Sequence, residues 1–138
     1  MRPIGGRIAN GQWVAYGTDG FIDWLTTLHG DPAVFLRVYE HLMDRVNRLE
    51  LAGPRVDNIR LIRKLHDHNG LGEAKYKDGS GAYRAFFKFG SLNGTKVVIF
   101  ADGDRKTSDN FSVSRFLRAE RLVDEAFDVF GVQHSKEW

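Results

Sequence analysis

The sequence predicts an α+β fold in which an N-terminal helical hairpin packs on a small antiparallel β-sheet, a meander, and a C-terminal helix follows. Three observations predict this fold. Apolar residues recur at helical spacing over residues 19–52 and again over 112–131. The stretch 73–101 between them consists of short segments rich in aromatic and β-branched residues, separated by turn residues. The sequence shows no strand–helix–strand unit of the kind that builds a parallel sheet, so the helices are expected to flank one antiparallel meander.

Capping residues set the predicted helix ends. Asp19 is the expected N-cap of the first helix, and Asp31-Pro32 begins the second with proline at its first position. Gly53-Pro54 ends that helix. The last helix begins near residues 112–114 and ends at Gly131, in the position where glycine follows a helix C-terminus. The length of 138 residues fits a single domain.

Turn signals define the predicted strands. Asn93-Gly94 is typical of a two-residue hairpin turn, and residues 78–81 form a four-residue loop in the hairpin before it. Residues 56–65 are ambiguous and fit a single helical turn. The strands are predicted at residues 12–16, 73–77, 82–89 and 96–101.

Composition excludes several classes of protein. The chain has no cysteine, hence neither a disulfide framework nor a thiolate metal site, and it suits the cytoplasm. No apolar run reaches membrane-spanning length, and residues 1–11 lack the apolar core of a secretory signal. His66-Asp67-His68 is too sparse for a metal site and fits a loop or a helix end better. We therefore expect a soluble protein without membrane contact, metal or cofactor.

The basic residues are concentrated in the middle of the chain. The net charge is only +2, but residues 45–106 contain 13 lysines and arginines against 7 acidic residues. A local excess of this kind suits a polyanionic partner such as nucleic acid. It is equally consistent with an ordinary solvated surface.

The predicted first hairpin gathers cations on one face of the sheet. A loop over residues 78–81 places Lys75 directly opposite Arg84, and Lys77, Phe86 and Lys88 share their face by alternation. Like charges that face each other destabilise a sheet, so this arrangement makes sense if an anion binds there. The opposite face is apolar enough to cover the helices.

The second hairpin extends this cationic face. With Asn93-Gly94 as the turn, Arg84 lies opposite Gly103, and the strand end brings Arg105 and Lys106 to the same face. Arginine can stabilise the charge that grows on a phosphodiester, and lysine can neutralise its oxygens. RNA supplies its own 2′-OH nucleophile, so such a site needs no metal. The alternative is a solvated basic face whose lysine stems cover aromatic rings.

These residues resemble the RelE superfamily of toxin–antitoxin ribonucleases, in particular its phage-derived HigB-like branch. The resemblance covers roughly residues 20–131 and is most specific from Lys75 to Phe111. A Lys-x-Lys strand precedes a Tyr-Arg strand in that family, as Lys75-Tyr76-Lys77 precedes Tyr83-Arg84 here. The segment from Gly103 through Arg105-Lys106-Thr107 is similar to the family's next motif. Residues 1–18 extend beyond the family pattern.

The resemblance implies a RelE-like fold and a metal-independent endoribonuclease that cuts mRNA on the ribosome by 2′-OH attack. Lys75 and Lys77 would act on the sugar and phosphate at the scissile bond, and Arg84 and Arg105 would stabilise the transition state. Further RNA contacts are expected from Lys88, Lys106, Phe86 and Phe111. The implied partners are ribosomal mRNA and a cognate antitoxin of the HigA or RelB kind.

One position departs from the family pattern. Phe111 stands where RelE has a catalytic tyrosine, and phenylalanine cannot exchange a proton. His66 and His68 are the candidates to replace it, and the general acid/base is unassigned. Two alternatives therefore stay open. The chain could inhibit a protein target, as ParE-type relatives inhibit DNA gyrase, or it could be an inactive phage or accessory relative that retains only partner binding.

Overall fold

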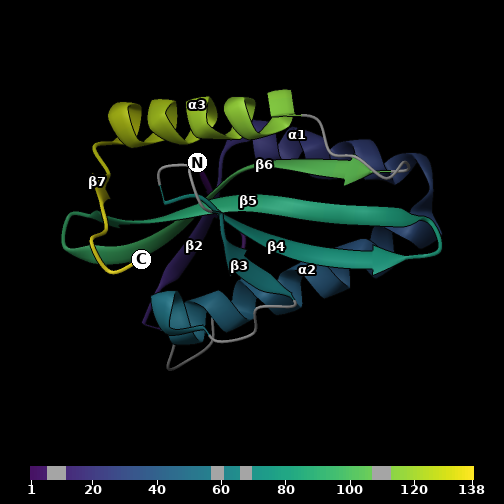
Figure 1. Ribbon diagram of the computed structural model, residues 1–138, viewed down its shortest axis with the longest axis horizontal. Coiled ribbons are helices and arrows are strands. Elements are labelled where there is room, and N and C mark those ends of the chain that lie inside the picture. The colour runs from purple at the N-terminus through teal and green to yellow at the C-terminus, as the bar shows by residue number, and fades with distance from the viewer. Residues whose placement is uncertain (6–11, 57–60, 66–69, 107–112) are drawn as a thin grey trace.

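The computed structural model describes residues 1–5, 12–56, 61–65, 70–106 and 113–138. Within these residues the fold has three layers, with one mixed β-sheet between helices (Figure 1). The strands are β1 (Arg2–Pro3), β2 (Val14–Gly17), β3 (Ile62–Lys64), β4 (Gly72–Asp78), β5 (Gly81–Leu92), β6 (Thr95–Lys106) and β7 (Gln133–His134). The helices are α1 (Asp19–Thr27), α2 (Pro32–Ala52) and α3 (Val113–Phe130), with 3₁₀ turns η1 (Leu28–Gly30) and η2 (Gly53–Arg55).

The fold class predicted from the sequence is wrong. The sheet is not a small antiparallel meander but has seven strands, in the order β1-β2-β6-β5-β4-β3, with β7 also paired to β5. β2 runs parallel to β6, with Val14 beside Val97 and Gly17 beside Phe100. The longest helix is α2, in the middle of the chain, and the helices cover both faces of the sheet. The strand predicted at residues 12–16 corresponds to β2, but β1, β3 and β7 are only two or three residues long, too short for a hydrophobic pattern to reveal.

Helix boundaries follow the local chemistry of the caps. Asp31 caps α2 as predicted, since its Oδ1 accepts from the N–H of Val34 and Pro32 is the first helical residue. Gly53 follows α2 with a φ of +54°, as predicted for the end of that helix. The cap of α1 is Thr18 rather than Asp19, because the Thr18 hydroxyl accepts from the N–H of Phe21 at 3.1 Å.

The two faces of the sheet bury separate apolar clusters. On one face, α1 and α2 pack on residues such as Tyr83, Phe87 and Phe100. On the other face, α3 packs on Phe86 and Ile99. Figure 1 shows α3 and α2 on opposite sides of the sheet. None of the described helices is both long enough and apolar enough to cross a membrane.

The hairpins that form the centre of the sheet are largely as predicted. Lys75 lies opposite Arg84 and Leu92 lies opposite Thr95, as the turn signals indicate. Asn93 and Gly94 have φ angles of +51° and +81°, the left-handed pair that a tight hairpin turn needs. The first hairpin is one pair longer than predicted, because Asp78 also pairs with Gly81.

A β-bulge in β6 was not predicted, and it changes the rest of that strand. Phe86 pairs with Asp102 but Phe87 pairs with Phe100, so Ala101 is an additional residue. The carbonyl of Ala101 accepts from the Thr18 hydroxyl at 2.7 Å, and the start of α1 is thereby attached to the bulge. Beyond the bulge Arg105 lies on the opposite face from the one predicted, because it pairs with Tyr83, whereas Lys106 pairs with Ala82 and lies on the predicted face.

Candidate nucleic-acid interface

Three lysines lie on the α3 side of the sheet, close to the turn between β4 and β5. Lys77 and Lys106 flank Ala82 from either side, and Lys75 lies in the next row beside Arg84. Residues that face each other across strands share one face of a sheet, so these three side chains do so. Lys77 is exposed, and Lys75 and Lys106 are half-buried. We call Lys75, Lys77 and Lys106 the lysine face.

Arg84 does not lie at the surface. Its side chain is 1 % exposed, and its guanidinium lies 4.8 Å from the ring centre of Phe86 and 4.3 Å from that of Phe116 in α3. Nη2 is 3.2 Å from Asp104 Oδ2, and Nη1 is 3.6 Å from Glu73 Oε2. Burial lowers the pKa of Arg84, while Asp104 and Glu73 oppose that shift. In this conformation Arg84 cannot contact a phosphate.

Arg84 belongs to a larger network of ion pairs in which the carboxylates of Glu73 and Asp102 are buried. Glu73, which is 2 % exposed, also binds Nε of Arg63 at 2.5 Å. Asp102 is fully buried and lies 3.5 Å from both Arg115 and Arg118 of α3. Arg115 also lies 3.6 Å from Asp104 and donates to the carbonyl of Gly103.

Arginines and carboxylates alternate through this network, which connects β3, β4, β5 and β6 to α3. We call it the arginine network; its members are Arg63, Glu73, Arg84, Asp102, Asp104, Arg115 and Arg118. Asp102 and Asp104 form ion pairs with Arg84 and with the arginines of α3, and burial raises the pKa of Asp102.

Arg105 lies on the face opposite to Arg84. It pairs across the strands with Tyr83, over whose ring its guanidinium lies at 5.4 Å, and Nη2 donates to the Ser80 carbonyl at 2.7 Å. The bulge at Ala101 is the cause, since without that extra residue Arg105 would share the face of Arg84. The four predicted catalytic residues are therefore not gathered at one site: Lys75 and Lys77 are at the surface, Arg84 is buried, and Arg105 faces the other way.

The predicted RNA-contacting residues also separate. Phe86 is fully buried and packs edge-on against Phe116 at 5.5 Å, so it offers no ring for a base. Lys88 lies on the α3 side, with its ammonium 5.6 Å from the Phe127 ring centre. Phe111, His66 and His68 lie outside the described residues.

Sequence reasoning missed a polar cluster around Asp78, at the turn between β4 and β5 on the α2 side of the sheet. Arg37 of α2 contacts Asp78 at 2.7 Å, Tyr76 donates to it at 2.9 Å, and the N–H of Ser80 donates at 2.7 Å. Burial raises the pKa of Asp78, but hydrogen bonds from Ser80, Arg37 and Tyr76 outweigh it and hold that pKa well below its ordinary value. The Asp-Gly-Ser order was the available signal, because aspartate commonly caps such a turn.

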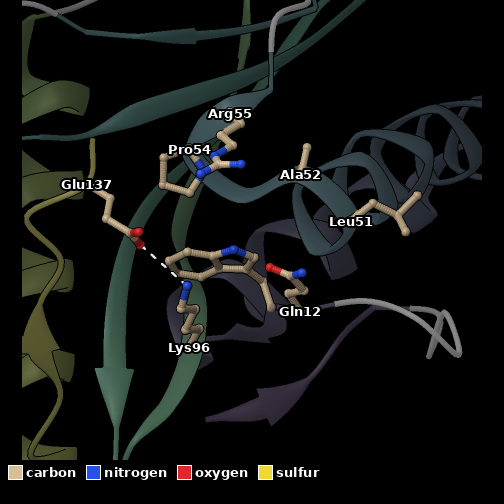
Figure 2. Close-up of a pocket in the computed structure, with 8 residues that line it drawn as sticks. Gln12, Leu51, Ala52, Pro54, Arg55, Lys96 and Glu137 are labelled. Atoms are coloured by element: carbon tan, nitrogen blue, oxygen red, sulfur yellow. Dashed lines mark ion pairs between the residues drawn. The ribbon is translucent and has the colours of Figure 1, made fainter.

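A hollow of about 780 Å³ lies at the far end of the sheet (Figure 2). The ammonium of Lys96, which lines the hollow, lies 3.9 Å from a carboxylate oxygen of Glu137 and 5.4 Å from the ring centre of Trp13. The charge of Lys96 is thus partly neutralised. The remaining lining residues are Gln12, Leu51, Ala52, Pro54 and Arg55.

Comparison of the chain with models of known protein families gives no match, and neither does comparison with curated proteins. Any function for the chain therefore has to be proposed from its own residues.

Proposed function

We propose that this protein binds RNA through the lysine face and cuts it as a toxin-type, metal-independent endoribonuclease. The observation that supports the proposal is the clustering of three lysines on one side of the sheet, from the two strands β4 and β6 that flank β5. Neither Lys75 nor Lys77 forms an ion pair with a described residue. Cations without carboxylate partners bind phosphates and release the counterions of a polyanion.

The proposed chemistry uses the 2′-OH of the RNA as the nucleophile. It attacks the adjacent phosphorus, the bond to the 5′-oxygen of the next nucleotide breaks, and a 2′,3′-cyclic phosphate forms. Lys75 and Lys77 would neutralise the charge on the phosphate oxygens as the attack proceeds. Arg84 would act as a positioning residue that holds β4 against β5, and Arg105 has no part in the site. The resemblance of residues 75–111 to RelE toxins suggests ribosomal mRNA as the substrate and a cognate antitoxin as the regulator.

A second candidate is a relative without catalysis, which binds a protein partner through the same face. The burial of Arg84 between two carboxylates favours it, because the transition state would then lack its expected arginine. Phe111 favours it too, since it cannot replace a tyrosine as acid or base.

Inducible expression in a bacterium, followed by primer extension on abundant mRNAs, separates the two candidates. The endoribonuclease predicts growth arrest with codon-phased cuts that disappear in the double variant Lys75→Gln/Lys77→Gln. Lys96→Gln is the matched control, because it removes an exposed lysine at the other end of the sheet. Arrest with intact mRNA supports the protein-binding candidate. Cuts that persist in the double variant contradict the role of the lysine face.

A further inference from the structure

One edge of β5 is shared by two strands that leave a gap between them. β4 pairs with β5 as far as Phe87, and β7 pairs with it from Gly90 onward. Lys88 and Phe89 therefore have no strand of the described residues beside them on that edge. A hollow of about 260 Å³ lies at this gap, and its lining residues are Gly70, Lys88, Phe89, His134, Ser135 and Trp138.

Two side chains that carry N–H donors, Lys88 and Trp138, approach Gly70. A Cβ placed on Gly70 would lie 3.6 Å from Cε of Lys88 and 4.0 Å from Cδ1 of Trp138, so both side chains reach the space that this glycine leaves open. Cδ1 is bonded to the indole N–H, which is buried and donates to no described residue. Lys64 fixes Trp138 by donating to its carbonyl at 2.8 Å. A buried donor without a partner costs about 1–3 kcal/mol, which a bound acceptor would recover.

Ser135 and Phe89 add polar groups to the same hollow. The Ser135 hydroxyl oxygen accepts from the N–H of Glu137 at 3.2 Å, which leaves its own O–H to donate. The carbonyl of Phe89 accepts from the N–H of Ser135 at 3.2 Å. The N–H of Phe89 points toward the same edge, since both groups of one residue do so in an antiparallel strand.

The charges around the hollow favour an anion. None of its six lining residues is a carboxylate. The Lys88 ammonium lies 5.6 Å from the centre of the Phe127 ring, and the centre of the His134 ring lies 4.6 Å from it. Burial lowers the pKa of Lys88, with Asp124 and Glu120 opposing the shift. Burial and then the charge of Lys88 lower the pKa of His134, with Asp124 opposing. An anion between the two would relieve their repulsion and the cost of burying the ammonium.

We propose that this hollow binds a phosphate group, with the Lys88 ammonium and the Trp138 indole N–H as its principal donors. Ser135 and His134 complete the ring of donors around a tetrahedral oxyanion. Because a water molecule occupies about 30 Å³, the hollow has room for a phosphate and a small substituent. Free phosphate and a phosphate monoester at an RNA end present the same chemistry. The site does not depend on the lysine face and stands whether or not the protein cuts RNA.

Titration of the ¹⁵N-labelled protein with sodium phosphate tests the site directly, against sodium chloride at equal ionic strength. We expect the indole N–H resonance of Trp138 to shift in a saturable way. Lys88→Met should weaken binding by about ten-fold or more, as expected for the loss of a charged hydrogen bond. Trp138→Phe should weaken it several-fold. Lys96→Met is the control, since it removes a lysine that also lies over an aromatic ring, and it should leave the affinity unchanged.

Two further arms identify the source of the phosphate and exclude another anion. Tighter binding of a short 5′-phosphorylated oligonucleotide than of its unphosphorylated form would support the site and assign it to RNA ends. Equal binding of the two, with inorganic phosphate still bound, would support the site and assign it to free phosphate. The proposal is overturned if phosphate produces no saturable shift, if Lys88→Met binds as tightly as the parent, or if acetate binds equally well. Amide spectra of each variant show whether it is folded.

Discussion

Arg84→Met removes the central cation of the arginine network and nearly conserves the volume of the side chain. The guanidinium lies 3.6 Å from Glu73 and 3.2 Å from Asp104, and it is enclosed by the rings of Phe86 and Phe116. Glu73 has 2 % of its side chain exposed, so water cannot replace the lost partner. Arg63, in the edge strand β3, would remain as the only ion-pair partner of Glu73 among the described residues.

The expected cost follows from this burial. Removing one member of a buried ion pair destabilises a protein by about 3–5 kcal/mol, because the remaining charge is left without compensation. Asp104 keeps Arg115 and is 16 % exposed, and Arg63 keeps part of the Glu73 interaction, so the loss should lie at the lower end, about 3 kcal/mol. Domains of this size are stable by only about 5–15 kcal/mol, so the variant should fold but unfold at much lower denaturant.

Urea unfolding at pH 7, followed by far-ultraviolet circular dichroism, measures the loss. Lys77→Met is the control: it removes an exposed cation from the neighbouring row and should cost less than about 0.5 kcal/mol. The triple variant Glu73→Gln/Arg84→Met/Asp104→Asn removes the stranded charges and should recover most of the loss. A loss below about 1 kcal/mol for Arg84→Met, or a triple variant no more stable than the single one, would refute the assignment of Arg84 as a structural residue.

Three other substitutions test separate features. Asp78→Asn should cost about 1 kcal/mol at pH 7, and the difference should vanish as urea titrations are repeated at falling pH, because a carboxyl with a lowered pKa stabilises the fold only while it is ionised. Glu50 is buried with one oxygen unpaired, and burial raises its pKa, so the stability that this carboxyl contributes is lost as pH rises. Glu50→Gln should therefore raise the melting temperature at pH 7, and the melting temperature of the variant should change less between pH 5 and pH 7 than that of the parent. Gly103→Ala should lower the free energy of unfolding in urea by about 1–3 kcal/mol, since its Cβ would lie 2.1 Å from the Trp24 ring. Gly79→Ala is the control, because its Cβ would meet no atom within 4 Å and should cause no steric loss of stability.

Local signals in the sequence predict the central hairpins and the helix starts because short-range chemistry decides them. Asn93-Gly94 permits the two positive φ angles of a tight turn, and Asp31-Pro32 supplies both a cap and a fixed φ. The pairing of Lys75 with Arg84 then follows from the turn alone. The short strands at the sheet edges have no comparable signal. β2 overlaps the strand predicted at residues 12–16, but no local signal predicts its parallel pairing with β6, about 80 residues later in the chain.

The candidate site failed to assemble as predicted because of one residue that no local signal marks. The bulge at Ala101 is stabilised by Thr18, a partner 83 residues away in the chain, so the sequence around it does not reveal it. It turns Arg105 to the α1 and α2 side and brings Asp102 and Asp104 to the side of Arg84. A face predicted to carry unpaired cations thus acquires its own carboxylates.

The α3 side of the sheet consequently has two regions with different roles. In the buried region each arginine is matched by a carboxylate, and removing either partner disturbs the attachment of α3. In the exposed region the row of Lys77, Ala82 and Lys106 contains no carboxylate. An Arg84 variant that stops cutting RNA would therefore not identify a catalytic arginine, because the substitution also weakens the ion pairs and ring contacts beneath α3. Only substitutions of Lys75 and Lys77, which form no ion pair with the described part of the chain, can separate a loss of function from a loss of structure.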